Sequence, residues 1–319
     1  MQITGDVMRR GVRFLFTFVS LSYFAITGYA GETLIRLEEP AGLDRTGWPV
    51  GLGFPFLKGE LRDVSSLNVV SPEGTPVPVQ TKVLEKWPDG SIRWAHVLFP
   101  ADMKAQKTAD WRLSWETGTP VPKPRTPVHA ASDSDGISID TGTLKARIGT
   151  GGFRLFESLN VDGREILAPR SSEGFRIVTS DGRMFTTAND RNGRISIEEN
   201  GPIRTIVRAD GVHRSRDGAA LFDYTCRMFF YAGKPWCEIE YRFTNRENPD
   251  SVEVASVSLA ARLSKPAGGL RGATSEYKID RFWDFDSPFR IYSGEQDFFG
   301  VFGGAVMYRS DGSEVTGMG

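Results

Sequence analysis

Apolar and polar residues alternate with a period of two along much of this chain. The alternation is clearest over residues 79–87 and resumes over residues 92–99, where the second run is almost continuously apolar. Pro88-Asp89-Gly90 separates the two runs, and these residue types favour a tight turn. Alternation on both sides of such a turn predicts a β-hairpin. We therefore expect a chain built from β-strands.

Shorter runs of the same kind recur through residues 31–117. Pro, Gly, Asp and Ser separate these runs, and only residues 101–109 resemble a helix. Many short strands separated by such turn-forming residues predict a small barrel or a sandwich. The expected strands are Thr33–Glu38, Pro49–Phe54, Leu67–Ser71, Val77–Trp87, Ile92–Phe99 and Asp110–Thr117.

The composition changes at residues 118–135, which hold four prolines and no pattern of a buried strand. This stretch predicts a Pro-rich, extended linker. Residues 136–319 then carry longer runs separated by Asp-Gly turns, which is typical of an antiparallel β-sandwich. The longer strands expected there are Leu144–Ile148, Phe153–Val161, Gly174–Thr179, Ile195–Glu199, Pro202–His213, Ala220–Tyr231, Trp236–Asn245 and Val252–Leu263.

The first thirty residues have the pattern of a signal peptide. Three arginines precede the uncharged run Phe14–Ile26, and Gly28-Tyr29-Ala30 supplies small residues for cleavage. The run is shorter than the roughly 20 residues that span a bilayer, although a retained anchor is the alternative. We expect a secreted or periplasmic protein without a membrane segment after cleavage. The formal net charge of −1 argues against a nucleic-acid partner.

The two cysteines fall on neighbouring strands of a predicted hairpin, around Ala232-Gly233-Lys234-Pro235. If Cys237 faces Phe230, then Cys226 lies four residues further along the same strand. That separation is roughly 13 Å, whereas a disulfide needs Cα atoms within about 7 Å. We therefore expect two separate buried thiols.

Two motifs together resemble a known family. The first is GWPVGLGFPFLKGEL at residues 47–61, and the second is Trp-Pro-Asp-Gly-Ser at residues 87–91, followed by Ile-Arg-Trp. The pair resembles the N-terminal RIFT barrel of exo-rhamnogalacturonan lyase-like proteins, and residues 201–245 resemble their central β-sandwich. The resemblance implies an all-β fold in which a small N-terminal RIFT-type β-barrel is followed by an antiparallel β-sandwich.

The resemblance also implies a secreted, carbohydrate-active protein with a pectin-type polysaccharide or oligosaccharide as partner. In that family a downstream α-helical toroid carries the catalytic centre. No helical pattern of sufficient length occurs in this sequence. We therefore assign no catalytic residue, and expect either a sandwich truncated at its C-terminal end that lacks its helical partner domain, or two β domains that stand alone.

Motifs for other chemistry are lacking in the sequence. His96, His129 and His213 lie far apart, which argues against a metal site. We expect His96 in the core, and His129 and His213 in solvent. No Gly-x-Ser-x-Gly elbow and no phosphate-binding loop occur. We expect no cofactor and no metal.

Candidate sugar-binding residues gather near the end of the chain. A lyase acting on a uronate needs a cation for the carboxylate and a base for the adjacent proton, and aromatic rings can stack on sugars. The candidates are Tyr277, Arg281, Trp283, Asp284, Asp286, Arg290 and Tyr292. The alternative is an aromatic core with solvated charges between its members. A secondary candidate surface is Trp87, Asp89 and Arg93, for which a structural role is also open.

Three hypotheses follow. The chain is the non-catalytic front part of an exo-acting polysaccharide lyase, in which case the sandwich should expose a large apolar patch toward its partner domain. Alternatively, it is a stand-alone glycan-binding or surface-interaction module without enzymatic activity. The least favoured hypothesis is a complete lyase with its active site on the sandwich.

Overall fold

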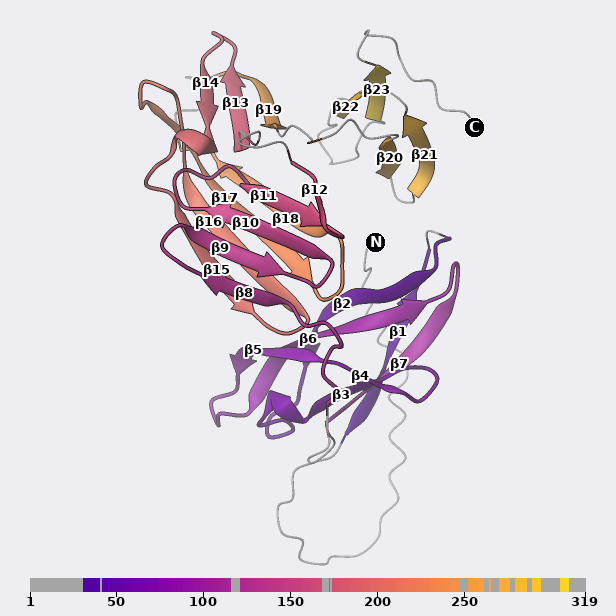
Figure 1. Cartoon of the computed structure of the whole chain (residues 1–319). Coiled ribbons are helices and arrows are strands. Elements are labelled where there is room, and N and C mark those ends of the chain that lie inside the picture. The colour runs from indigo at the N-terminus through magenta and orange to yellow at the C-terminus, as the bar shows by residue number, and fades with distance from the viewer. Residues whose placement is uncertain are drawn as a thin grey trace, which may run out of the picture. The chain divides into compact units, whose positions relative to one another are not determined.

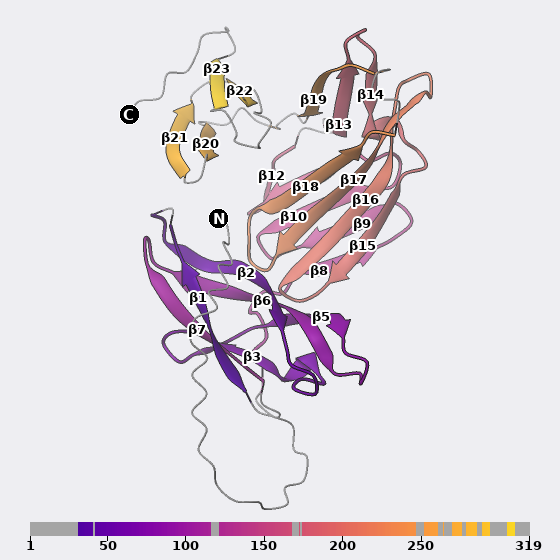
Figure 2. The ribbon, with the colours of Figure 1, turned by 180° about the vertical axis from the view of Figure 1, so that it is seen from behind.

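The computed structural model describes residues 31–40, 42–115, 121–167, 172, 174–246, 252–260, 264, 270–275, 279–285, 289–293 and 305–309, and for the last four ranges it describes the backbone. The predicted signal peptide, residues 1–30, lies outside these ranges. Figures 1 and 2 show the ribbon from opposite sides, with strands as the predominant element. The chain divides into two compact units between Pro122 and Lys123. The predicted all-β fold is confirmed.

Seven strands form the first unit, a small barrel. They are β1 (Glu32–Glu38), β2 (Arg45–Pro55), β3 (Leu67–Val70), β4 (Pro76–Val77), β5 (Gln80–Lys86), β6 (Ile92–Met103) and β7 (Thr108–Trp115). A short 3₁₀ turn, η1 (Val64–Ser66), precedes β3. Two antiparallel sheets, in the orders β1-β7-β3-β4 and β2-β6-β5, share one core. Buried residues such as Val50, Val69, Val97 and Leu113 reach that core from both sheets.

The predicted hairpin is β5–β6, and its register shifts near the turn. Lys86 pairs with Ile92, but the ladder then passes over Arg93. Such a bulge moves the side-chain alternation by one residue. Ile92 and Ala95 are therefore both buried, while Trp94 between them stays partly exposed. A strict period of two does not hold through this hairpin.

The helix expected over residues 101–109 is absent, and that prediction was wrong. Strand β6 extends to Met103, with Ala101 and Met103 buried on either side of the exposed Asp102, and β7 begins at Thr108. The Asp102 carboxylate accepts a hydrogen bond from the backbone N–H of Gly47 at 2.5 Å. The alternation of β6 thus extends further than the apolar run that predicted it.

Two sheets form the sandwich of the second unit. The five-stranded sheet, in the order β12-β11-β10-β9-β8, consists of β8 (His129–Ser132), β9 (Gly136–Asp140), β10 (Leu144–Gly149), β11 (Ser158–Val161) and β12 (Arg164–Glu165). The seven-stranded sheet follows the order β18-β17-β16-β14-β13-β19, with β15 also paired to β16. Its strands are β13 (Gly174–Thr179), β14 (Met184–Thr186), β15 (Arg194–Asn200), β16 (Arg204–Arg214), β17 (Ala220–Tyr231), β18 (Cys237–Thr244) and β19 (Val254–Ala260).

The two sheets lie face to face, as both ribbon views show. Their core joins Ile139 and Ile148 of the five-stranded sheet to Val207, Met228 and Phe230 of the seven-stranded sheet. All of the strand pairings are antiparallel, so the predicted antiparallel sandwich is confirmed. A second 3₁₀ turn, η2 (Thr187–Asn189), follows β14.

The end of the predicted linker belongs to the sandwich. Residues 129–132 form β8, which pairs with β9. Val128 is buried in the sandwich core, and its N–H donates to the carbonyl oxygen of Pro202 at 2.9 Å. One buried residue in a proline-rich stretch carries no periodicity, which is why the sequence pattern did not reveal this strand.

The cysteine hairpin has the register expected from the sequence. Cys237 pairs with Phe230, and Cys226 pairs with Tyr241 further along the strands. Both thiols are free, with Cys226 buried and Cys237 half-buried. Burial raises the pKa of the Cys226 thiol to about 12 and that of Cys237 to about 11. Both thiols are therefore protonated and unreactive at neutral pH.

Candidate functional site

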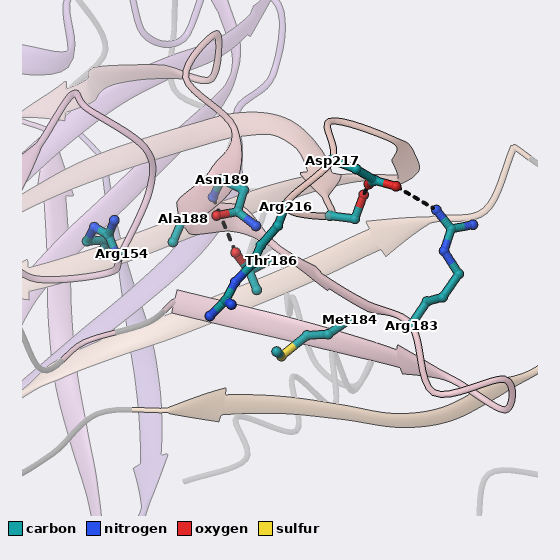
Figure 3. A pocket seen from close by; sticks show the side chains of 9 residues that line it. Arg154, Arg183, Met184, Thr186, Ala188, Asn189, Arg216 and Asp217 are labelled. Carbon is teal, nitrogen blue, oxygen red and sulfur yellow. Dashed lines mark hydrogen bonds and ion pairs between the residues drawn. The ribbon is translucent and has the colours of Figure 1, made fainter.

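A cavity of about 670 Å³ opens on the sandwich, and Figure 3 shows it from close by. Its walls come from the loop after β10, the β13–β14 hairpin, η2 and the β16–β17 turn. The polar residues that line it are Arg154, Arg183, Thr186, Asn189, Ser215, Arg216 and Asp217. We call this feature the arginine cavity.

Thr187 ties the floor of the arginine cavity together. Its buried hydroxyl donates to the carbonyl oxygen of Phe153 at 2.7 Å and accepts from the N–H of Phe175 at 3.1 Å. Gly152 allows this close approach, because it has φ +108° and a Cβ there would lie 2.3 Å from a carbonyl oxygen of η2. The loop that carries Arg154 is thus bound to η2 and β13.

Asp190 holds the strand end from which the β16–β17 turn begins. Its buried carboxylate accepts from the N–H of Val212 at 2.8 Å and from Nε of Arg214 at 3.2 Å. Nδ2 of Asn189 donates to the carbonyl oxygen of Arg214 at 3.0 Å. These bonds fix η2 against β16, and so place the turn that carries Arg216.

Asp217 is the acidic group of the lining. It accepts from the Ser215 hydroxyl and from the N–H of Ala219 at 3.4 Å, and Nη2 of Arg183 lies 3.8 Å from its Oδ2. The Ser215 hydroxyl is the main cause that lowers the pKa of Asp217, and the Ala219 N–H and Arg183 lower it further. The side chain therefore stays a carboxylate that partly neutralises Arg183.

The other two arginines of the lining are exposed and lack such a partner. Within the described part of the chain, the side chains of Arg154 and Arg216 make no hydrogen bond or ion pair. In Figure 3, Arg216 lies between Arg154 on one side and the Arg183–Asp217 pair on the other. The lining thus holds three guanidinium groups and one carboxylate. Arginine binds carboxylate and phosphate groups through paired N–H donors, so this cavity suits an anionic ligand.

The sequence did not identify this cavity. Ser180-Asp181-Gly182 and Arg216-Asp217-Gly218 are two of the Asp-Gly turns that separate the predicted strands, and their spacing carries no chemical motif. Arg183 directly follows the first turn, and Arg216 belongs to the second. Only the pairing of β13 with β14, and of β14 with β16, brings Arg183 and Asp217 together.

Five of the seven sugar-binding residues predicted near the end of the chain lie in two separate two-stranded sheets. Tyr277 and Asp286 lie outside the described residues. Arg281, Trp283 and Asp284 belong to β21 (Ile279–Phe285), which pairs with β20 (Leu270–Ser275). Arg290 and Tyr292 belong to β22 (Phe289–Ser293), which pairs with β23 (Ala305–Arg309). In the described part of the chain these two sheets do not pair with each other, and the cluster stays a prediction.

The secondary surface on the barrel is held by local contacts. Nε1 of Trp87 donates to the carbonyl oxygen of Phe56 at 3.1 Å, and the Arg93 guanidinium lies 4.8 Å from the Trp87 ring centroid. Arg93 also pairs with Glu85 at 2.9 Å. Asp89 accepts from the side chain of Ser91 at 2.5 Å, which lowers the pKa of Asp89. These contacts favour a structural role.

The same hairpin explains why the two family motifs occur together. The hydroxyl of Ser91 accepts from the N–H of Gly59 at 2.9 Å, and the N–H of Ile92 donates to the carbonyl oxygen of Leu61 at 2.7 Å. The N–H of Phe56 donates to a β6 carbonyl at 2.9 Å. The end of the first motif is therefore bound to the turn of the second.

The three histidines have different surroundings. His96 is half-buried and His129 is exposed. The expectation that His213 is exposed was wrong, because its side chain is fully buried. Its Nδ1 lies 2.8 Å from the carbonyl oxygen of Phe222, and its Nε2 contacts the Tyr241 hydroxyl. The arginine-rich turn that follows His213 suggested solvent, but the ring of this β16 residue lies inside the sandwich.

Two features are absent from the residues that the structure describes. There, no helix has the length and apolar character needed to cross a membrane. Among the same residues, no group of three or more His, Cys, Asp or Glu side chains could hold a metal ion.

Comparisons with known proteins match both units. Residues 37–114 match the PcRGLX-like N-terminal RIFT barrel domain, and residues 128–265 match the PcRGLX-like protein central beta sandwich domain. Together these matches cover about two thirds of the chain. The chain is also 26% identical over 204 residues to the uncharacterized protein YetA of Bacillus subtilis (strain 168). That alignment covers 62% of this chain and 23% of YetA.

Proposed function

This chain belongs to the PcRGLX-like family, the exo-rhamnogalacturonan lyase-like family that its sequence resembles, and on that premise we propose that it is a secreted or periplasmic carbohydrate-active protein. In this proposal the arginine cavity binds an acidic, pectin-type polysaccharide or oligosaccharide. The two β units hold this glycan without cleaving it. Any β-elimination belongs to a further, helical catalytic domain with which these units work.

The observation that carries the proposal is the excess of guanidinium groups in the arginine cavity. Arg154 and Arg216 face the cavity without an internal partner, while Arg183 is only partly neutralised. A uronate residue carries a carboxylate that such groups bind through charge-assisted hydrogen bonds. Asn189 and Thr186 add polar atoms to the same lining, which suit sugar hydroxyls. A neutral glycan would leave the arginines uncompensated, so an acidic sugar is the better fit.

The same lining argues for holding rather than cleaving. Elimination needs a base with a pKa near the working pH, placed beside the acidic proton. The carboxylate of Asp217 is a poor base, because its hydrogen bonds and Arg183 lower its pKa. The described residues that line the cavity include no histidine, lysine or tyrosine. The groups present can therefore neutralise a uronate but are not suited to remove its proton.

The test is titration calorimetry of the purified chain with rhamnogalacturonan oligosaccharides, beside a neutral glucan of similar length. We expect binding of the acidic glycan alone, and weaker binding at higher salt because exposed charges are screened. Arg154→Ala and Arg216→Ala should each weaken binding by about tenfold. Arg164→Ala is the matched control, since this exposed β12 arginine lies outside the cavity.

Each outcome bears on the proposal. Equal affinity for both glycans, or an equal loss from Arg164→Ala, would remove the arginine cavity as the binding site. The same samples, followed by ultraviolet absorbance, report unsaturated uronide. Product formed by the purified chain would overturn the non-cleaving role and favour a complete lyase. Binding without product is the expected result.

A further inference from the structure

We propose that residues 265–319 fold back onto the sandwich and cover an apolar surface that the described strands leave open. This surface consists of Ile239 and Phe243 of β18 and Val257 and Leu259 of β19, and we call it the apolar edge. The occupant is thus a segment of this chain. The proposal is independent of the glycan-binding role argued above.

The apolar edge is formed by side chains that point to the core side of the sheet. Ile239 pairs with Met228 and Phe243 pairs with Tyr224, and both of these partners are buried. Residues directly opposite each other on antiparallel strands share a face. Even so, Ile239 is 36% and Phe243 is 41% exposed. The described strands of the facing sheet therefore leave this part of the inner face open.

Strand β19 shows the same arrangement at the far end of the sheet. Val257 pairs with the buried Ile177, and Leu259 pairs with the buried Phe175, yet Val257 is 41% and Leu259 is 43% exposed. The Phe175 ring of β13 also stacks on Tyr241 of β18, with ring centroids 3.7 Å apart. That contact brings β13, the strand that pairs with β19, against β18.

The path of the chain leads to this opening. After β19 ends at Ala260, Ser264 already contacts the edge of the other sheet. The N–H of Ser264 donates to the carbonyl oxygen of Ile166 at 2.9 Å, and its hydroxyl donates to the backbone carbonyl oxygen of Glu165 at 2.5 Å. Glu165 ends β12, the outermost strand of the five-stranded sheet. The chain has therefore passed from β19, an edge strand of the seven-stranded sheet, to β12, an edge strand of the five-stranded sheet.

The segment that follows needs such a surface. Its described strands form two separate two-stranded sheets, β20–β21 and β22–β23. An isolated two-stranded hairpin is at best marginally stable in water, and it gains stability by packing an apolar face against another element. Residues 265–319 are rich in aromatic residues, which the exposed side chains of β18 and β19 would match.

The first test is hydroxyl-radical labelling of the full chain at low concentration, read by peptide mass spectrometry. If the segment covers the apolar edge, Ile239 and Phe243 should be labelled several-fold less than their exposure in the described strands implies. Leu34 and Leu84 of the barrel are the internal standards, because they are 64% and 53% exposed. Labelling of the edge at the level of these standards would overturn the proposal.

The second test introduces a charge. In the full chain, Phe243→Asp should release the segment, so that proteases cut within residues 265–319 about tenfold faster. Leu84→Asp, a matched change on an exposed barrel leucine, should leave that rate unchanged. An unchanged rate for Phe243→Asp would overturn the proposal. So would protection of the edge that disappears on dilution, because a second copy would then be the occupant.

Discussion

The barrel and the sandwich both expose large apolar side chains, but they distribute them differently. In the barrel, Leu34, Leu57, Leu84 and Trp94 lie on separate elements, three of them on different strands and one in a loop. In the sandwich, Ile239 and Phe243 share β18, and the remaining large residues lie mainly on β19. Apolar residues scattered singly are normal on a protein surface, whereas a contiguous group marks an interaction site. The arrangement, and not the number of such residues, distinguishes the two units.

Their polar groups differ in the same way. The polar groups of the barrel hairpin have partners within the barrel. Nε1 of Trp87 donates to a loop carbonyl oxygen, and Arg93 pairs with Glu85. In the arginine cavity of the sandwich, Arg154 and Arg216 are without a partner among the described residues. The motifs that identify the family thus stabilise the barrel, while the charges available to a ligand lie in turns without a motif.

The variants with the largest expected effect on stability test whether the two units unfold separately. Phe99 in the barrel and Phe230 in the sandwich are fully buried. Phe99→Ala and Phe230→Ala should each lower the free energy of unfolding of their own unit by about 3–5 kcal/mol, through lost burial and the cavity left behind. Differential scanning calorimetry should show two transitions, of which each variant moves one. A single transition that both variants shift equally would mean that the units unfold together.

A smaller effect compares two buried hydroxyls that join distant segments. Ser91 links the two barrel motifs, and Thr187 links the cavity floor to β13. Ser91→Ala and Thr187→Val should each lower the free energy of unfolding by about 1–3 kcal/mol, because a buried N–H loses its acceptor. In addition, Thr187→Val should weaken binding of acidic oligosaccharides, since Arg154 follows Phe153 in the loop that this hydroxyl holds. Equal binding by the two variants would separate the cavity floor from ligand recognition.

These cases show what the sequence could predict. Alternation located the long strands but missed β8, β9, β12 and β14. It also gave the register of β17–β18 well enough to place Cys226 and Cys237 apart. It failed where a strand has few buried residues, and where the buried positions continue beyond the apolar run. Strand β8 has too few buried positions to show a period, and the helix expected at residues 101–109 ignored the buried Ala101 and Met103.

The candidate site was harder to predict because it depends on contacts between distant segments. Arg154 and Arg216 lie sixty-two positions apart in the numbering. They line the same cavity because η2 is bonded to the loop of Arg154 through Thr187 and to β16 through Asn189. Residue types near one another in sequence, such as Arg281 and Trp283, are easy to group. Such grouping says nothing about which turns a fold brings together.

The smallest expected effect is a difference in pH dependence between the two units. Burial disfavours the charged ring and lowers the pKa of His213 below its ordinary value of 6.5, and it outweighs the carbonyl oxygen of Phe222, which raises this pKa. The unfolded chain then binds more protons than the folded one below pH 6.5, so the sandwich should lose stability as the pH falls through that value. In the barrel, burial opposes ionisation of Glu39, but backbone N–H groups and Arg45 outweigh it and lower the pKa below 4.5. That contribution is present above pH 4.5 and is lost only below it.

Lowering the pH from 6.5 to 4.5 should therefore lower the midpoint temperature of the sandwich transition more than that of the barrel transition, and calorimetry measures both. The change is limited to about 1.4 kcal/mol for each unit by which the His213 pKa is lowered. His213→Gln keeps polar atoms at the site but removes the titrating group, so it should flatten the dependence of the sandwich and leave that of the barrel unchanged. A sandwich midpoint that falls equally with and without His213 would assign the acid sensitivity to other groups, and the contrast between the units would then rest on packing alone.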